Sequence, residues 1–154
     1  MVVTVALVVG GAVVLPAAAD AQGAPTTSLL TNIRVGRHAT FDRVVLDFSG
    51  PAPASPTWQW VPALVMDGSG QRVSLPGNKF LRVVAHAASA NLAGRATYHG
   101  RTSFTTPQLR NVRAVALVGD FEGVLSVGLG VRHTSWVHVF TLTGPSRLVV
   151  DVGR

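Results

Sequence analysis

From Leu30 to the C-terminus, apolar residues recur at every second position instead of with the helical period of about 3.6 residues. In the segment 43–48, one face carries valine, leucine and phenylalanine, while the other carries arginine, valine and aspartate. The segments 125–131 and 147–152 also alternate. Because successive side chains of a strand point to opposite faces, this pattern predicts half-buried β-strands.

Turn-forming residues separate the predicted strands. They are Gly50-Pro51, the run 67–70, the run 76–78, Gly119-Asp120 and Gly144-Pro145. Asp67-Gly68 and Gly144-Pro145 stand where hairpins would turn. About seven to nine short strands with such punctuation predict an all-β fold, either a β-sandwich or an open barrel. A helical turn is expected only within 85–96.

Two of the alternating segments resemble each other. Residues 41–48 and 146–152 share the pattern Arg-apolar-apolar-apolar-Asp-apolar. The match is consistent with two sheets built on similar hairpins, and it is too short to establish an internal duplication.

The first residues predict an export signal. Residues 2–15 are almost wholly apolar, and this length suits a signal-peptide core better than a membrane span. Small-x-small patterns follow at 17–19 and 19–21, as before a signal peptidase site. No lysine or arginine precedes the apolar run, so an uncleaved membrane anchor is the alternative. The predicted organisation is a signal peptide over 1–21, a linker over 22–29 and one domain over 30–154.

The charge balance favours anionic partners. The formal net charge is +6, and twelve of the thirteen basic residues are arginine, the exception being Lys79. A basic surface attracts anionic glycopolymers, lipid or nucleic acid. The arginines are scattered singly, without the clustered basic footprint of nucleic-acid binding, so no nucleic-acid partner is predicted.

The residues that catalysis would need are missing or isolated. There is no cysteine, no Gly-x-Ser-x-Gly motif and no phosphate-binding loop. Glu122 is the only glutamate, and the five histidines show no metal-ligand spacing. We therefore predict no catalytic residues, no metal and no cofactor. A small hydrolase with a dispersed site at Asp120, Glu122 or a histidine is the less favoured alternative.

Two neighbouring features are candidate ligand-binding positions. Asp120 and Glu122 flank an aromatic residue in a segment bounded by glycines. The two carboxylates are either polar contacts for a ligand or part of an ordinary hairpin loop in which the aspartate caps a turn. Ser126, Gly128 and Gly130 then share one strand face that is almost free of side chains. Such a face admits a flat ligand, or the backbone of a neighbouring segment.

Large aromatic residues are the remaining candidates. Trp58 and Trp60 are expected on the same face of one strand, and Trp136 lies near the start of another. Exposed rings of this kind stack on sugars, whereas buried ones close a core. The sequence leaves both interpretations open for these tryptophans and for Tyr98.

The order of these segments resembles the actinobacterial AMIN-like domain family. The resemblance rests on residues 33–38, 41–51, 118–129 and 145–152, and together these span nearly the whole predicted domain. It implies an antiparallel β-sandwich related to AMIN domains. Those domains are non-catalytic modules, found beside peptidoglycan amidases and in envelope secretion machinery, and thought to direct their partners to the cell wall.

The predicted function is a non-catalytic, exported cell-envelope module that binds peptidoglycan or an associated wall polymer. The alternative is a structural or protein-interaction module of the envelope that uses an exposed sheet edge or the glycine face. A membrane contact is expected only through an uncleaved N-terminal segment.

Overall fold

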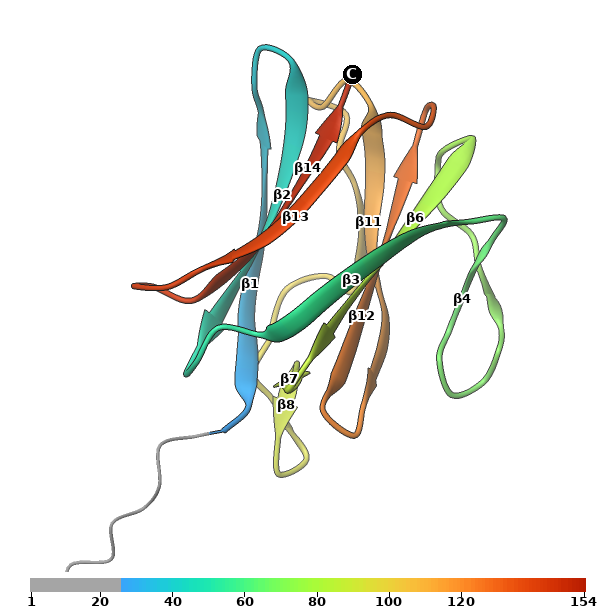
Figure 1. Ribbon diagram of the computed structural model, residues 1–154. Helices are drawn as coiled ribbons and strands as arrows, with labels where there is room; N and C mark the ends of the chain where they lie inside the picture. The colour runs from blue at the N-terminus through green and yellow to red at the C-terminus, as the bar shows by residue number, and fades with distance from the viewer. Residues whose placement is uncertain (1–25) are drawn as a thin grey trace, which may run out of the picture.

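The alternating segments form strands, and the strands form two five-stranded sheets that pack face to face (Figure 1). The computed structural model describes residues 26–154, and within that range it contains fourteen strands and no helix. The predicted all-β sandwich is confirmed. In this part of the chain there is accordingly no helix long and apolar enough to span a membrane.

Sheet A has the strand order β13-β14-β2-β1-β7. Its strands are β1 (Ser28–Arg37), β2 (Phe41–Ser49), β7 (Ala88–Ser89), β13 (Val137–Leu142) and β14 (Arg147–Gly153). Neighbouring strands are antiparallel except β1 and β7, which run parallel. The long central strands β2 and β14 come from opposite ends of the domain. Their pairing therefore forms only when residues about a hundred positions apart in sequence meet.

Sheet B has the strand order β10-β11-β12-β6-β3, and all its pairs are antiparallel. Its strands are β3 (Ala54–Val61), β6 (Lys79–His86), β10 (Ser103–Thr105), β11 (Val112–Phe121) and β12 (Val124–Val131). Strands β3 and β13 are the edges of the two sheets on one side of the sandwich.

Two small hairpins complete the fold. The first joins β4 (Leu64–Val65) to β5 (Arg72–Val73) and turns at the predicted Asp67-Gly68 position. The second joins β8 (Asn91–Leu92) to β9 (Arg95–Ala96). The helical turn expected within 85–96 is wrong, because Ala87, Ala93 and Gly94 have φ values of 51°, 49° and 78°. Positive φ is incompatible with a right-handed helix.

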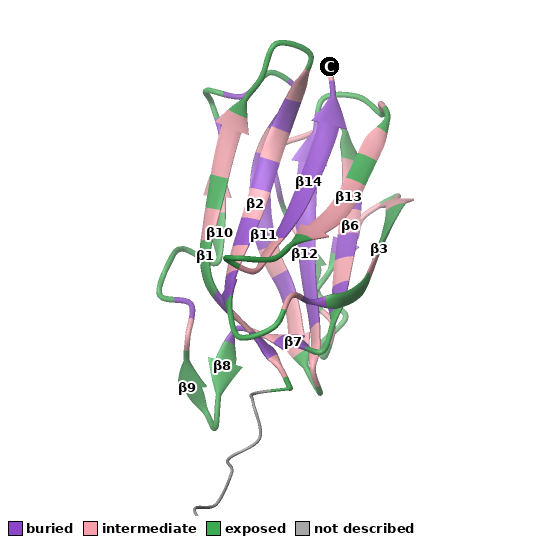
Figure 2. Ribbon diagram, turned by 60° about the vertical axis from the view of Figure 1, so that its left-hand side comes forward, coloured by how far each residue is buried: buried purple, intermediate pink, exposed green. Residues whose placement is uncertain are grey.

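The core lies between the sheets, where the apolar face of each strand is buried. Figure 2 shows buried and partly exposed residues alternating along β2, as the sequence predicted. Val44 and Leu46 of β2 are 0% and 1% exposed and pack with Leu81 of β6 and Leu129 of β12. Burying such side chains stabilises the fold by about 2 kcal/mol each.

The two similar segments are neighbours in one sheet, not equivalents in two. Strand β2 pairs antiparallel with β14, so Arg43 lies opposite Asp151 and Asp47 lies opposite Arg147. The hypothesis of two sheets built on similar hairpins is therefore wrong. The shared pattern arises because each strand must present the charge that is complementary to its partner.

A buried polar network joins the two sheets at one end of the sandwich. The Asp42 carboxylate, fully buried in sheet A, accepts hydrogen bonds from the backbone N–H groups of Asn111 (2.6 Å) and Val112 (3.1 Å) in the segment that opens β11. The Asn111 side chain donates to the Gly153 carbonyl at the end of β14 (2.7 Å). It also accepts from the backbone N–H groups of Arg132 and His133 after β12 (3.1 and 3.2 Å).

The domain begins earlier than predicted. Ser28 is fully buried, its backbone N–H donates to Ala87, and its hydroxyl donates to the carbonyl of Pro51. Ser28 and Leu29 therefore belong to β1 rather than to a linker over 22–29. The predicted signal peptide over 1–21 lies outside the described residues.

Replacing Asp42 by alanine is expected to lower the free energy of unfolding by about 3 kcal/mol, because two buried backbone N–H groups lose their acceptor. Urea denaturation followed by fluorescence measures the change. Asp47→Ala is the matched control, since Asp47 pairs on the surface with Arg34, and it should cost less than about 1 kcal/mol. Equal losses in both variants would contradict the structural role of Asp42.

Candidate functional site

The residues that we predicted from the sequence as ligand contacts do not form one site. Ser126, Gly128 and Gly130 lie on β12 in sheet B, and Asp120 and Glu122 lie at the tip of the β11–β12 hairpin. The tryptophans are also divided: two lie on the edge strand β3, and the third precedes β13 in sheet A. Each group therefore has to be judged separately.

The glycine face of β12 is closed by the protein itself. In Figure 1 the β4–β5 hairpin lies on the side of sheet B that faces away from sheet A. A Cβ atom at Gly128 would meet Leu64 Cδ1 at 2.5 Å, and one at Gly130 would overlap the carbonyl oxygen of Pro76. The prediction of an open ligand surface here is wrong. The glycines allow the backbone of the covering segment to approach the sheet closely.

Ser126 is also buried, with a hydroxyl that accepts a hydrogen bond from Arg82 Nη2 (3.2 Å). The same Arg82 nitrogen donates to Asp67 Oδ1 (2.6 Å), and the backbone N–H of Asp67 donates to Val118. Ser126 therefore helps to fasten the β4–β5 hairpin onto sheet B. Its proposed contact with a ligand is wrong as well.

Asp120 and Glu122 occupy a tight hairpin. Glu122 and Gly123 have φ values of 48° and 74°, as a two-residue turn of the primed type requires. One carboxylate oxygen of Asp120, Oδ2, accepts from the backbone N–H of Ala90 (3.0 Å) and from Asn91 Nδ2 (2.7 Å). Asp120 therefore anchors the segment between β7 and β8, rather than capping its own turn.

Trp58 and Trp60 share one face of β3, as predicted. Their ring centroids are 6.5 Å apart in an edge-to-face arrangement. Trp60 packs against the core, whereas Trp58 is 41% exposed. These tryptophans mainly close the edge of the sandwich beside β3, although Trp58 is exposed and the half-buried Trp60 lines a hollow beside Lys79.

Trp136 lies in a different environment, on the outer face of sheet A. Opposite Phe41 in the sheet stands Gly153, and the backbone N–H of Gly153 donates to the Trp136 carbonyl (3.0 Å). A Cβ at Gly153 would overlap the Trp136 indole, so the ring lies across this glycine. The indole is thus held beside Phe41 while the residue remains 52% exposed.

The outer face of sheet A gathers further aromatic and basic side chains around Trp136. We call this set the aromatic–arginine face, and it consists of His38, Phe41, Arg43, Trp136, His138 and Phe140.

The rings of this face form two groups, one of His38, Phe41 and Trp136 and the other of His138 and Phe140. His38 stacks on Phe41 with centroids 4.4 Å apart and an interplanar angle of 12°. Phe41 is tilted against Trp136 at 5.9 Å, and His138 against Phe140 at 4.9 Å. Trp136, His38 and His138 are exposed, whereas Phe41 and Phe140 are half-buried beneath them.

Arg43 lies between the two groups of rings. Its Cζ atom is 5.2 Å from the Phe41 centroid and 5.8 Å from the Phe140 centroid, within the range of cation–π attraction. Its Nε and Nη2 donate to the two carboxylate oxygens of Asp151 at 2.7 and 2.8 Å. These hydrogen bonds raise the pKa of Arg43, so the guanidinium stays charged between the rings.

A second arginine–aspartate pair extends this face toward β1. Arg34 donates through Nε and Nη2 to Asp47 at 2.6 and 2.7 Å, and these bonds raise the pKa of Arg34. The Arg34 side chain is 54% exposed, so the pair is a surface pair. Chemically, the whole face can stack on a flat apolar ligand surface and donate hydrogen bonds from fixed guanidinium groups.

Sequence reasoning found only Trp136 among these residues. Part of the pattern that identifies this face is visible in the sequence. Phe41 and Arg43 share the polar face of the alternating segment 41–48, and Phe140 and His138 share one face of 137–142. What the sequence did not provide was the order β13-β14-β2, which brings these faces together. Between residues 26 and 154, no three His, Cys, Asp or Glu side chains are grouped so as to hold a metal ion.

Comparison with protein families matches residues 28–154 to the AMIN-like domain. The matched range contains every strand of the structure. Searches of curated proteins and of solved structures found no significant match. AMIN-like domains are typically associated with the periplasm or cell envelope, which suggests a cell-wall-associated binding module.

Gly130→Ala is expected to lower the free energy of unfolding by about 2 kcal/mol, because the new methyl group overlaps the Pro76 backbone and forces the covering segment outward. Thermal and urea unfolding measure this. Gly68→Ala, in the β4–β5 turn with open space around it, is the matched control and should be nearly neutral. A neutral Gly130→Ala would show that the cover is not closely packed.

Arg43→Met is expected to destabilise the protein by about 2 kcal/mol, because Asp151, whose side chain is only 8% exposed, loses its charged partner. Arg34→Met should cost less than about 1 kcal/mol, since that pair is solvated. Urea denaturation of both variants gives the comparison, and a larger loss for Arg34→Met would contradict this ranking.

Proposed function

Because the chain belongs to the AMIN-like domain family, we propose that it is a non-catalytic module of the cell envelope that binds peptidoglycan or an associated wall polymer. We assign this binding to the aromatic–arginine face of sheet A. The proposal includes export of the protein, for which the apolar segment 2–15 and the small residues after it are the support.

The observation that carries the proposal is the contrast between the two outer sheet faces. The outer face of sheet B is covered by the β4–β5 hairpin, and the space over its glycines is occupied by the Leu64 side chain at Gly128 and by the Pro76 backbone at Gly130. The outer face of sheet A carries exposed rings instead, and Trp136 is 52% exposed. Exposed apolar side chains that gather on one face of a protein are typical of an interaction surface.

The chemistry of this face suits a glycan. A sugar ring has an apolar side that packs on an aromatic ring and hydroxyl groups that accept hydrogen bonds. Trp136 and Phe41 provide the rings, and Arg43 and Arg34 provide donors held in place by aspartates. The net charge of +6 adds attraction to anionic wall polymers.

The carboxylates support a non-catalytic role. In residues 26–154 the aspartates at 42, 47, 67, 120 and 151 all hold backbone N–H groups, arginines or an asparagine in place. Only Glu122, exposed at a hairpin tip, is free of such a partner within that range. General acid–base catalysis needs a titratable side chain within hydrogen-bond reach of the proton that it transfers, and these five aspartates are instead engaged in structural contacts.

The test is cosedimentation of the purified protein with peptidoglycan sacculi, with and without their anionic polymers. The protein should sediment with the walls, and the double variant Phe41→Ala/Trp136→Ala should bind about tenfold more weakly. Added salt should weaken binding more to walls that keep their anionic polymers, because salt screens exposed charges.

Phe121→Ala is the matched control, because Phe121 is 70% exposed but lies at the β11–β12 hairpin tip. This variant should retain full wall binding. Absence of sedimentation with either wall preparation at low salt would end the proposal. Release of soluble wall fragments that stops on Asp120→Ala or Glu122→Ala would instead favour the hydrolase alternative.

A further inference from the structure

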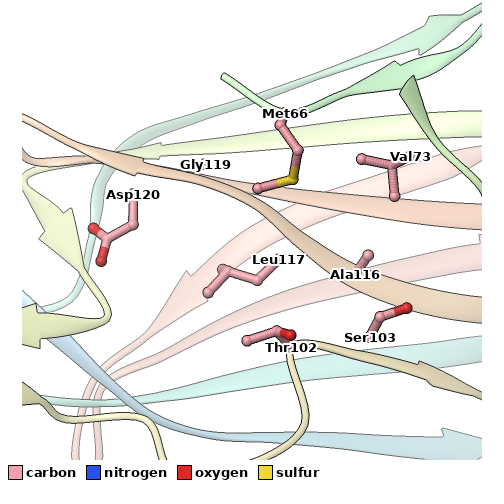
Figure 3. A pocket seen from close by; sticks show the side chains of 8 residues that line it. All are labelled: Met66, Val73, Thr102, Ser103, Ala116, Leu117, Gly119 and Asp120. Atoms are coloured by element: carbon pink, nitrogen blue, oxygen red, sulfur yellow. The ribbon is translucent and has the colours of Figure 1, made fainter. Parts of the chain in front are cut away.

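A groove lies outside the aromatic–arginine face, between the β4–β5 hairpin and the edge of sheet B formed by β10 and β11 (Figure 3). Its volume is about 310 Å³. Met66 and Val73 of the hairpin stand on one side and Leu117 on the other, with Ala116 between them. The walls are thus mainly aliphatic.

The groove continues along β11 toward the hairpin tip. A second hollow of about 240 Å³ shares Met66, Gly119 and Asp120 with the first and ends at Phe121. Together the hollows follow β11 from residue 116 to residue 121. At about 3.4 Å per residue this distance accommodates roughly five residues of an extended chain.

Beyond its short pairing with β10, β11 has no strand partner on the groove side, and there the Val118 carbonyl accepts a hydrogen bond from the backbone N–H of Asp67 (2.9 Å). The pairing of β10 with β11 ends at Ser103 opposite Ala116, and the last backbone hydrogen bond of that pairing runs from Leu117 N–H to the Thr102 carbonyl (2.7 Å). In a hairpin with a two-residue turn, the flanking residues exchange hydrogen bonds, so the N–H and C=O of Asp120 point away from β12. An open strand edge of this kind is a template for another chain.

The far end of the groove is acidic in an otherwise basic protein. Asp120 lines it and Glu122 follows at the turn, while the chain as a whole carries a net charge of +6. Ala90 and Asn91 occupy only the Oδ2 atom of Asp120. Its Oδ1 atom and the exposed Glu122 carboxylate therefore provide acceptors for a cationic group.

We propose that this groove binds an extended peptide segment of a partner protein, with an aliphatic side chain between Met66 and Leu117 and a lysine or arginine next to it facing Asp120 and Glu122. The peptide backbone adds to the open edge of β11. The edge without a strand partner favours a polypeptide over a lipid chain, and the two carboxylates set the sign of the charge. This site is on sheet B and is independent of the wall-binding face.

The test begins with a random octapeptide library displayed on phage and selected on the purified protein. Enriched peptides should combine β-branched or aliphatic residues with an adjacent lysine or arginine. A fluorescein-labelled copy of the best peptide then gives affinities by anisotropy. Met66→Glu should weaken binding about tenfold, because it places a charge in the aliphatic wall.

A second variant tests the charge without disturbing the fold. Asp120→Asn/Glu122→Gln keeps an oxygen acceptor for Ala90 and Asn91 but removes both charges. It should bind the labelled peptide about tenfold more weakly and should no longer discriminate against a copy in which the basic residue is replaced by glutamate. Phe41→Ala/Trp136→Ala should leave peptide binding unchanged, and Met66→Glu should leave wall binding unchanged.

Several outcomes would overturn the proposal. These are a selection that enriches no peptide, enriched peptides that bind Met66→Glu as well as the unaltered protein, or enriched peptides without a basic residue. Competition by a free fatty acid or a wall-derived muropeptide that exceeds competition by the unlabelled peptide would assign the groove to another occupant. Because Phe41→Ala/Trp136→Ala spares peptide binding and Met66→Glu spares wall binding, failure here is distinguishable from failure of the wall-binding proposal.

Discussion

The Asp42 carboxylate is the one group on which both sheets depend. It belongs to β2 in sheet A, yet its hydrogen bonds fix the start of β11 in sheet B, and Asn111 carries the connection on to β14 and the end of β12. Apolar packing between sheets is tolerant of small sliding movements. The directional hydrogen bonds that the buried Asp42 carboxylate accepts do not tolerate such sliding, so this network sets how one sheet is placed against the other.

With the sheets fixed, their outer faces take different roles. Sheet B keeps its strand surface small, with glycine and alanine, and receives a covering hairpin that Asp67 and Arg82 fasten. Sheet A keeps large rings and arginines on its outer face, and no hairpin within residues 26–154 covers them. The two proposed sites follow from this difference. The wall-binding site is the outer face of sheet A, and the peptide groove lies between the β4–β5 hairpin and the edge of sheet B at β11.

Local pattern was sufficient to predict the long strands, their inward faces and the turns at Asp67-Gly68 and Gly144-Pro145, because alternation and turn chemistry are properties of neighbouring residues. Local pattern did not predict the β8–β9 hairpin, and the turn that it placed at Gly119-Asp120 lies within β11. It was insufficient for the site. Trp136 and Phe41 meet only because β14 lies between their strands, and Gly130 is closed by a segment more than fifty positions earlier in the chain. The arginine and aspartate that recur in β2 and β14 are consistent with the pairing register of these two strands. That register could be inferred from them only once the two strands were known to be neighbours.

The repeated pattern on β2 and β14 is self-complementary in one orientation only. About the central pair Val45 and Val149, antiparallel pairing sets each arginine opposite an aspartate. A parallel arrangement of the same two segments would set arginine against arginine and aspartate against aspartate, and a shift by two residues would set a charge against a valine. These four charged residues thus disfavour the parallel direction and the nearest shifted register at the centre of sheet A, and the pair Arg43–Asp151 forms the ion pair that this register permits.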